Sequence, residues 1–182
     1  MSKSMLISIQ PYYVFLIIAK AMGWNITQEK TIEVRKTIPK DKNWDRKTII
    51  YCSKNKKSFA KIPKEYQPLM EKFLGKVIGE FVCDEIIEIL PDNEIYGTYD
   101  ISDDEVIASC LVNGDLWNYG KGKTLYGFHI SDLVIYDKPK ELREFRKPID
   151  CHRGLQSYNC SGCWDCEITR PPQSYCYVEE LV

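Results

Sequence analysis

The chain has 182 residues, of which 44% are hydrophobic and 28% charged, and its formal net charge is −1 at pH 7. This length suffices to bury one sizeable core, and the composition is that of a folded globular protein, not of a disordered chain. The apolar stretch near the N-terminus is interrupted at Gln10 and Pro11, which leaves it too short for a membrane span or an export signal. We therefore expect one globular domain, no membrane segment and a cytoplasmic protein.

Charge is distributed unevenly along the chain. Residues 28–64 contain twelve Lys or Arg and four Asp or Glu, whereas residues 80–105 contain ten acids and no base. The basic segment predicts a face for polyanions, and the acidic segment predicts a surface that repels nucleic acid. The alternative is that these two segments pair with each other across the fold.

The first part of the chain predicts strands around one buried helix. A strand at residues 5–9 is followed by a helix that begins at Pro11 and ends before Gly23, and this helix is apolar nearly all round. Residues 31–36 alternate between apolar and charged side chains, which predicts a half-buried strand with a charged face. The next predicted strand covers residues 48–53.

The second part predicts further elements of both kinds. They are a helix from Pro68 to Gly75, a long strand over 76–89 with a bend or bulge at Gly79, a helix beginning at Ser102, and strands at 124–130 and 133–136. This order predicts an α+β fold, a small mixed β-barrel decorated with helices. We expect the barrel to occupy 1–137 and a Cys-rich appendage to occupy 138–182, with a last strand at about 172–180 that returns to the barrel.

Six metal-capable side chains lie close together near the C-terminal end. They are Cys151, His152, Cys160, Cys163, Cys166 and Cys176. Thiols stay reduced in the cytosol, so this spacing predicts a structural zinc site made by Cys151, Cys160, Cys163 and Cys166, with His152 and Cys176 in reserve. An iron–sulfur cluster and the absence of any metal are the alternatives; against the cluster, Arg170 stands before Pro171 where a ferredoxin run has its fourth Cys. The isolated Cys52, Cys83 and Cys110 are expected to be small buried apolar residues.

Several motifs resemble the ASCH domain, a family of the PUA-like barrels. The family pattern G-x-K-x-x-E-x-R is matched at Lys30, Glu33 and Arg35, with Gln28 in place of the glycine. Its closing Pro-Gln-Ser-aromatic segment is matched at 172–175. Further matches are Leu6, Ser8, Ile9, Pro11, Tyr51, Ser53 and the run 75–81. The resemblance covers residues 5–136 and 171–178 and leaves Cys151–Cys166 as an insertion.

The resemblance implies a cleft beside the barrel that binds RNA or a nucleotide. The residues it implies as ligand-binding are Lys30, Glu33, Arg35, Tyr51, Ser53, Glu80, Gln173 and Ser174. Arg35 offers a planar fork to a phosphate or base edge, Lys30 a point cation, and Glu33 an acceptor or general base. Without the family context, the same charged strand is an ordinary solvated salt-bridging face.

Three functions remain open at this stage. The first is an RNA- or nucleotide-binding module, which we favour because no trio of residues indicates acyl or phosphoryl chemistry by its spacing. The second is an enzyme on RNA or a modified nucleoside, similar to a ribonuclease or an acylcytidine amidohydrolase, with Lys30, Glu33 and Thr31 as candidate catalytic residues and Ser174 as another candidate hydroxyl. The third is an adaptor whose metal-bearing tail contacts a protein partner.

Tyr51 and Tyr177 are candidate stacking residues, and His129 is expected to be structural.

Overall fold

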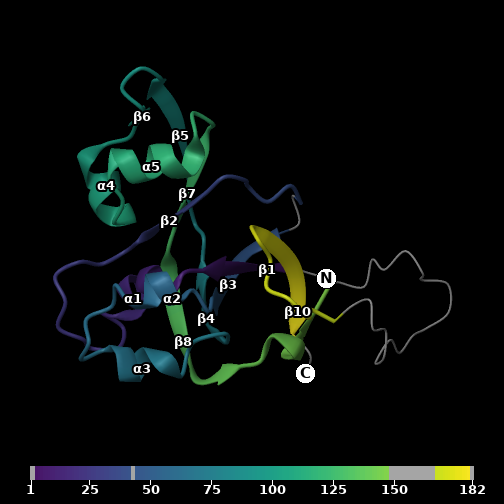
Figure 1. The fold of residues 1–182 in the computed structure, drawn as a ribbon. Coiled ribbons are helices and arrows are strands. Elements are labelled where there is room, and N and C mark those ends of the chain that lie inside the picture. Colours follow the sequence, from purple (N-terminus) through teal and green to yellow (C-terminus); the bar gives the residue numbers. More distant parts are fainter. Residues whose placement is uncertain (1–2, 42–43, 148–166, 181–182) are drawn as a thin grey trace, which may run out of the picture.

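The structure, a computed structural model, describes residues 3–41, 44–147 and 167–180. Within these residues the strands form one six-stranded and one four-stranded sheet (Figure 1). The strands are β1 (Lys3–Ile9), β2 (Ile32–Arg35), β3 (Trp44–Cys52), β4 (Val77–Val82), β5 (Ile86–Asn93), β6 (Thr98–Asp100), β7 (Leu125–His129), β8 (Ser131–Lys140), β9 (Phe145–Arg146) and β10 (Tyr175–Glu180). The helices are α1 (Pro11–Ile18), α2 (Lys56–Phe59), α3 (Gln67–Glu71), α4 (Asp103–Ser109), α5 (Asn113–Gly120) and the 3-10 helix η1 (Leu142–Glu144). The predicted α+β class is confirmed, and the strands are arranged as a curled half-barrel.

Strand β1 is an interior strand of the six-stranded sheet, whose order is β8-β4-β3-β1-β10-β9. It pairs in parallel with β3, so that Ser8 lies opposite Tyr51 and Ile9 opposite Cys52. Both strands therefore end at the same edge of the sheet. Pro11 then starts α1 immediately after β1, because its fixed φ suits the first helical position. The carboxyl ends of two parallel strands and a helix N-terminus thus lie side by side.

The largest core lies between this sheet and the helices α1 and α3. Helix α1 buries five consecutive residues from Val14 to Ile18, as expected for a helix that is apolar all round. They pack with inward-facing residues of β1, β3 and β4 and with Met70 and Phe73 from the α3 region. Helix α1 ends at Ile18, four residues earlier than predicted, and no helix in the described part of the chain is long and apolar enough to cross a membrane.

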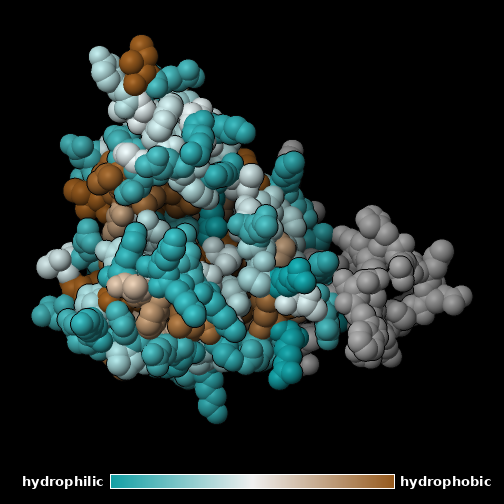
Figure 2. Space-filling model, in the orientation of Figure 1, coloured by the Kyte–Doolittle hydropathy of each residue, from teal (hydrophilic) through white to brown (hydrophobic). Residues whose placement is uncertain are grey.

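The four-stranded sheet has the order β2-β7-β5-β6 and is covered on one face by α4 and α5. Ile32 and Val34 of β2 point to this face and pack with Leu116 of α5 and Leu125 of β7. Because side chains alternate along a strand, the charged residues of β2 point to the opposite face, toward β1 and α1. Figure 2 shows hydrophobic residues gathered over α4, where Ile107 is exposed.

The predicted long strand over residues 76–89 is wrong as a single element, because it is two strands in different sheets. β4 belongs to the six-stranded sheet and β5 to the four-stranded one. The intervening residues are bound elsewhere: the backbone N–H of Cys83 donates to Arg46, and the carbonyl of Glu85 accepts from His129. The expected irregularity at Gly79 is present, since the register with β8 shifts there and a Cβ would lie 2.3 Å from the carbonyl oxygen of Val134.

Two further elements bear on the site. Helix α5 was not predicted, because its sequence NGDLWNYG contains two glycines and few strong helix formers. The helix packs against the four-stranded sheet through the buried side chain of Leu116. At the C-terminal end, β10 pairs antiparallel with β1, with Cys176 opposite Leu6, while β8 runs on to Lys140, past residue 137.

Candidate functional site

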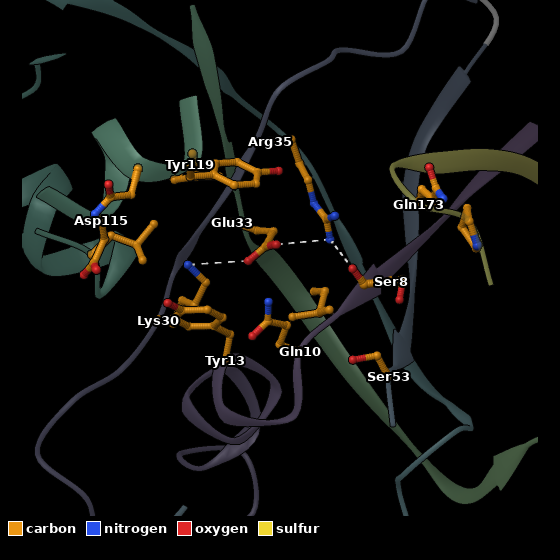
Figure 3. Close-up of a pocket in the computed structure, with 15 residues that line it drawn as sticks. Ser8, Gln10, Tyr13, Lys30, Glu33, Arg35, Ser53, Asp115, Tyr119 and Gln173 are labelled. Carbon is orange, nitrogen blue, oxygen red and sulfur yellow. Dashed lines mark hydrogen bonds and ion pairs between the residues drawn. The ribbon is translucent and has the colours of Figure 1, made fainter. Parts of the chain in front are cut away.

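A cavity of about 530 Å³ lies between the two sheets, at the edge where β1 ends and α1 begins. Its walls come from five regions of the chain: β1 with the start of α1, the β2 region, Ser53 just after β3, α5 with the residue Leu111 before it, and the segment before β10. Figure 3 shows the charged residues of β2 projecting into the space between these walls. The cavity is therefore assembled by the tertiary structure.

Three charged residues of the β2 region meet in this cavity, and all three are buried. Lys30, Glu33 and Arg35 are 2%, 7% and 7% exposed. The Nζ of Lys30 lies 3.4 Å from one carboxylate oxygen of Glu33, and the Nη2 of Arg35 lies 3.1 Å from the other. The single carboxylate thus bridges two cations, which leaves the trio with a net positive charge.

Both cations are also bound to backbone carbonyl groups of neighbouring elements. The Nζ of Lys30 donates to the carbonyl oxygen of Ser109 at 2.6 Å, and the Nη2 of Arg35 donates to that of Ser8 at 2.8 Å. Burial lowers the pKa of Lys30, while the carboxylate of Glu33 opposes this effect. The trio therefore ties β2 to β1 and to the end of α4, and its amine is easier to deprotonate than that of an exposed lysine.

Two tyrosines line the cavity from different sides of the trio. Tyr13 comes from the first turn of α1 and Tyr119 from α5, and Figure 3 shows them on opposite sides of Glu33. A lysine ammonium lies over each ring, that of Lys30 at 5.0 Å from the Tyr13 centroid and that of Lys36 at 4.5 Å from the Tyr119 centroid. Burial raises the pKa of both phenols, so they stay protonated at neutral pH.

Sequence reasoning did not predict ten of the fifteen residues that line the cavity, and six of these ten are polar. The missed polar residues are Ser8, Gln10, Tyr13, Asp115, Asn118 and Tyr119. Those on α5 were missed because the helix itself was not predicted. The spacing of Asp115, Asn118 and Tyr119 places them on one helical face, and this signal becomes visible once the helix is known.

Two of the other predicted ligand-binding residues also reach the cavity. Ser53, just after β3, and Gln173, before β10, both line it together with the trio. The hydroxyl of Ser53 is buried and has no hydrogen-bond partner among the described residues. The same holds for the Nε of Arg35, whose recorded contacts both use Nη2.

Three predicted ligand-binding residues lie away from the cavity wall. Tyr51 points to the other face of the sheet and packs with Leu6 and Val178 in a second core. Glu80 accepts hydrogen bonds from Lys47 and from the Tyr136 hydroxyl; although burial alone would raise its pKa, these bonds hold the pKa below its ordinary value. Ser174 lies beside the rim, where its hydroxyl is 2.7 Å from that of Thr37.

The remaining candidates of the barrel are placed as follows. Thr31 pairs through its backbone with Ala108 and Ile130 and is not among the residues that line the cavity. The Nδ1 of His129 lies 2.6 Å from Asp84, so this histidine is paired at the junction of the sheets. The hydroxyl of Tyr177 accepts a hydrogen bond from the backbone N–H of Asp41, which ties β10 to the segment after β2.

All four predicted zinc ligands, Cys151, Cys160, Cys163 and Cys166, and the reserve ligand His152 lie outside the described residues. Cys176 is described, and its side chain packs against the second core. Burial raises the pKa of this thiol to about 11, which disfavours the thiolate that a metal binds. No group of three or more His, Cys, Asp or Glu side chains that suits a metal occurs among the described residues.

The basic segment of the sequence divides into buried and exposed parts. Lys30 and Arg35 belong to the cavity, whereas Lys54, Lys56 and Lys57 are exposed on and just before α2. Since Lys54 follows Ser53 directly, these lysines begin next to the cavity wall. We call these three residues the α2 lysines.

The chain was compared with protein-family models, curated protein sequences and solved structures. No protein-family model matches the chain, and no curated protein sequence matches it. Among solved structures, the chain is similar to the crystal structure of ASCH from Zymomonas mobilis, with 18% identity and a TM-score of 0.47 over 97% of this chain and 88% of that chain. Two single-residue mutants of that protein, both at 16% identity, match with TM-scores of 0.48 and 0.47, covering 97% of this chain and 91% and 89% of theirs. The likeness to these structures concerns the overall fold alone.

Proposed function

We propose that the chain recognises one nucleotide unit, either free or as an unpaired residue of RNA, in the cavity around Lys30, Glu33 and Arg35. The observation that carries this proposal is that one cavity is lined both by a buried, net positive charged trio and by two tyrosines on different sides. A volume of about 530 Å³ lies in the range of small-molecule sites and suits a single nucleotide, not a duplex.

The chemistry of the walls matches the parts of a nucleotide. Tyr13 and Tyr119 offer aromatic faces on which a base of any kind can stack. Glu33 and Asp115 offer acceptors, and Arg35 offers donors, to the polar edge of a base or to a ribose. The α2 lysines next to Ser53 would contact the phosphates of a longer strand, although exposed charges of this kind contribute little specificity.

The test is calorimetric titration of the protein with the four ribonucleosides and their 5′-monophosphates. We expect saturable binding that Tyr119→Leu weakens by about ten-fold or more, because base–aromatic stacking contributes roughly 1–3 kcal/mol. Tyr96→Leu is the matched control, since Tyr96 is 80% exposed in the turn between β5 and β6, outside the cavity wall. Equal binding by both variants, or no binding of any of the eight compounds, would rule the proposal out.

One observation favours a second candidate, an enzyme acting on RNA or a modified nucleoside. The pKa of Lys30 is lowered by burial, and a more easily deprotonated amine next to a carboxylate suits proton transfer. Glu33→Gln separates the two candidates. In a binding protein it should change affinity by no more than about ten-fold, whereas in an enzyme it should lower turnover by about 10²–10⁴-fold while binding persists. Turnover of short RNAs or acylated nucleosides by the wild type, abolished in Glu33→Gln, would favour the enzyme.

A further inference from the structure

We propose that the end of the cavity at the N-terminus of α1 is a phosphate subsite, walled by Gln10, Arg35 and Ser53. The inference rests on the proposed function, because it assigns one part of the nucleotide to one part of the cavity. Its consequence is that the cavity prefers nucleoside monophosphates to neutral nucleosides.

The first observation is the position of the helix. Helix α1 has eight residues and begins directly after β1, at the edge where the parallel strands β1 and β3 both end. Its first turn contains Pro11, which has no backbone N–H, and Tyr12, whose N–H donates to the hydroxyl of Ser58 at 3.1 Å, while the Gln10 side chain makes no capping hydrogen bond. The positive end of the helix dipole therefore faces the cavity that Gln10 and Tyr13 line, and a helix N-terminus in this position favours an anion.

The second observation is the Nε of Arg35, which has no hydrogen-bond partner among the described residues. Its side chain is 8% exposed and lines the cavity, and its contacts to Glu33 and Ser8 both use Nη2. The buried Nε has no partner among the described residues. A buried donor without a partner costs about 1–3 kcal/mol, and an oxyanion that reaches this Nε after a small shift of the Arg35 side chain would remove the cost.

The third observation is Ser53, which stands immediately after β3. Its backbone N–H donates to the carbonyl oxygen of Ile9 at 2.9 Å, which holds Ser53 beside the start of α1. Its hydroxyl is buried without a partner among the described residues. A change of the side-chain torsion turns this hydroxyl toward an acceptor in the cavity, because a serine hydroxyl has three staggered positions.

Outside the trio, the charged side chain among the described residues that line the cavity is that of Asp115. Figure 3 shows Asp115 on the side opposite Ser53, with the charged trio between them. An anionic group is therefore repelled at the α5 end and attracted at the α1 end. This polarity suits a ligand with a phosphate at one end and a base with hydrogen-bond donors at the other.

The test uses two substitutions that leave the buried ion pairs intact. Gln10 is exposed, so Gln10→Glu adds a negative charge at the subsite, and a carboxylate at a helix N-terminus does not destabilise the fold. We expect it to weaken binding of 5′-monophosphates by at least ten-fold and binding of nucleosides by less than two-fold. Gln28→Glu, at an exposed position outside the cavity wall, is the matched control and should change neither.

Ser53→Ala should weaken monophosphate binding about three- to ten-fold and leave nucleoside binding unchanged, with Ser4→Ala on β1 as its control. Inorganic phosphate is titrated separately. If monophosphates and nucleosides bind equally and binding still depends on Tyr119, the phosphate subsite is wrong and the proposed function stands. A different outcome is that inorganic phosphate binds to the wild type and binds more weakly to Gln10→Glu, while nucleosides and monophosphates bind no more tightly than phosphate does. In that case the subsite stands and the proposed function is wrong. If none of these probes binds, both are wrong.

Discussion

Two sets of basic residues come from the same stretch of the chain and meet opposite environments. Lys30 and Arg35 are buried on either side of one carboxylate, whereas the α2 lysines are exposed to solvent. Burial strengthens every electrostatic interaction of the first set and fixes its geometry, while water and salt weaken those of the second. The contrast teaches that the local charge of the basic segment describes two different things: a specific site and a general attraction for polyanions.

The largest expected effect is a loss of free energy of unfolding when the carboxylate shared by Lys30 and Arg35 is removed. Glu33→Ala leaves two buried cations without their partner, and breaking a buried ion pair typically costs about 3–5 kcal/mol. Lys56→Ala should change the free energy of unfolding by no more than about 0.5 kcal/mol, because Lys56 is exposed. Urea denaturation of both variants measures the difference. A loss below about 1 kcal/mol in Glu33→Ala would mean that the trio is solvated in the same way as the α2 lysines.

The next effect concerns the geometry of the cation. Arg35→Lys keeps the charge but removes the planar fork and the Nε donor, so monophosphate affinity should fall about ten- to hundred-fold. Lys56→Arg, the reverse exchange at an exposed position, should leave this affinity unchanged within two-fold. Titration with one ribonucleoside 5′-monophosphate compares the two. An unchanged affinity in Arg35→Lys would show that Arg35 acts as a charge only.

A smaller effect should appear in the pH dependence of stability. Because burial lowers the pKa of Lys30, the folded protein releases this proton at lower pH than the unfolded chain does. Between the lowered pKa and the ordinary lysine value, the unfolded chain binds more protons, so stability rises with pH in that window. Relative to Lys30→Met, the wild type should therefore gain free energy of unfolding as the pH is raised from neutral toward 10. A difference that is constant with pH, or that falls, would contradict the lowered pKa.

The smallest effect on a mononucleotide is expected at the α2 lysines. The double substitution Lys56→Glu and Lys57→Glu should leave monophosphate affinity unchanged within two-fold, because both side chains lie outside the cavity wall. The same variant should weaken binding of a single-stranded RNA oligomer and reduce the slope of log affinity against log salt, by about 0.7 for each lost phosphate contact. RNA binding that is unaffected by this variant would remove the α2 lysines from the interface.

The local elements of the N-terminal half follow directly from the residues. The apolar run of β1, the proline that starts α1 and the alternation along β2 each specify an element through backbone geometry and burial alone. The cap of α4 is a similar case, since Ser102 accepts from the backbone N–H of Glu105, whose carboxylate accepts from Ser102 in return. The three charged residues were singled out in a different way, because they match three positions of a motif of the family that the sequence resembles; by themselves they would indicate a solvated strand face.

What only the tertiary structure decided is which residues face the trio. Helix α5 has a weak helical sequence and brings Asp115 and Tyr119 to the cavity when Leu116 is buried against the four-stranded sheet. The sequence does not distinguish the positions of Tyr51 and Ser53, since both belong to one predicted strand and both carry a hydroxyl group. Yet Tyr51 is buried in the second core, whereas Ser53 lies past the end of β3 at the cavity. Such assignments depend on how two sheets and their helices pack, and packing between distant segments leaves no periodic signal in the chain.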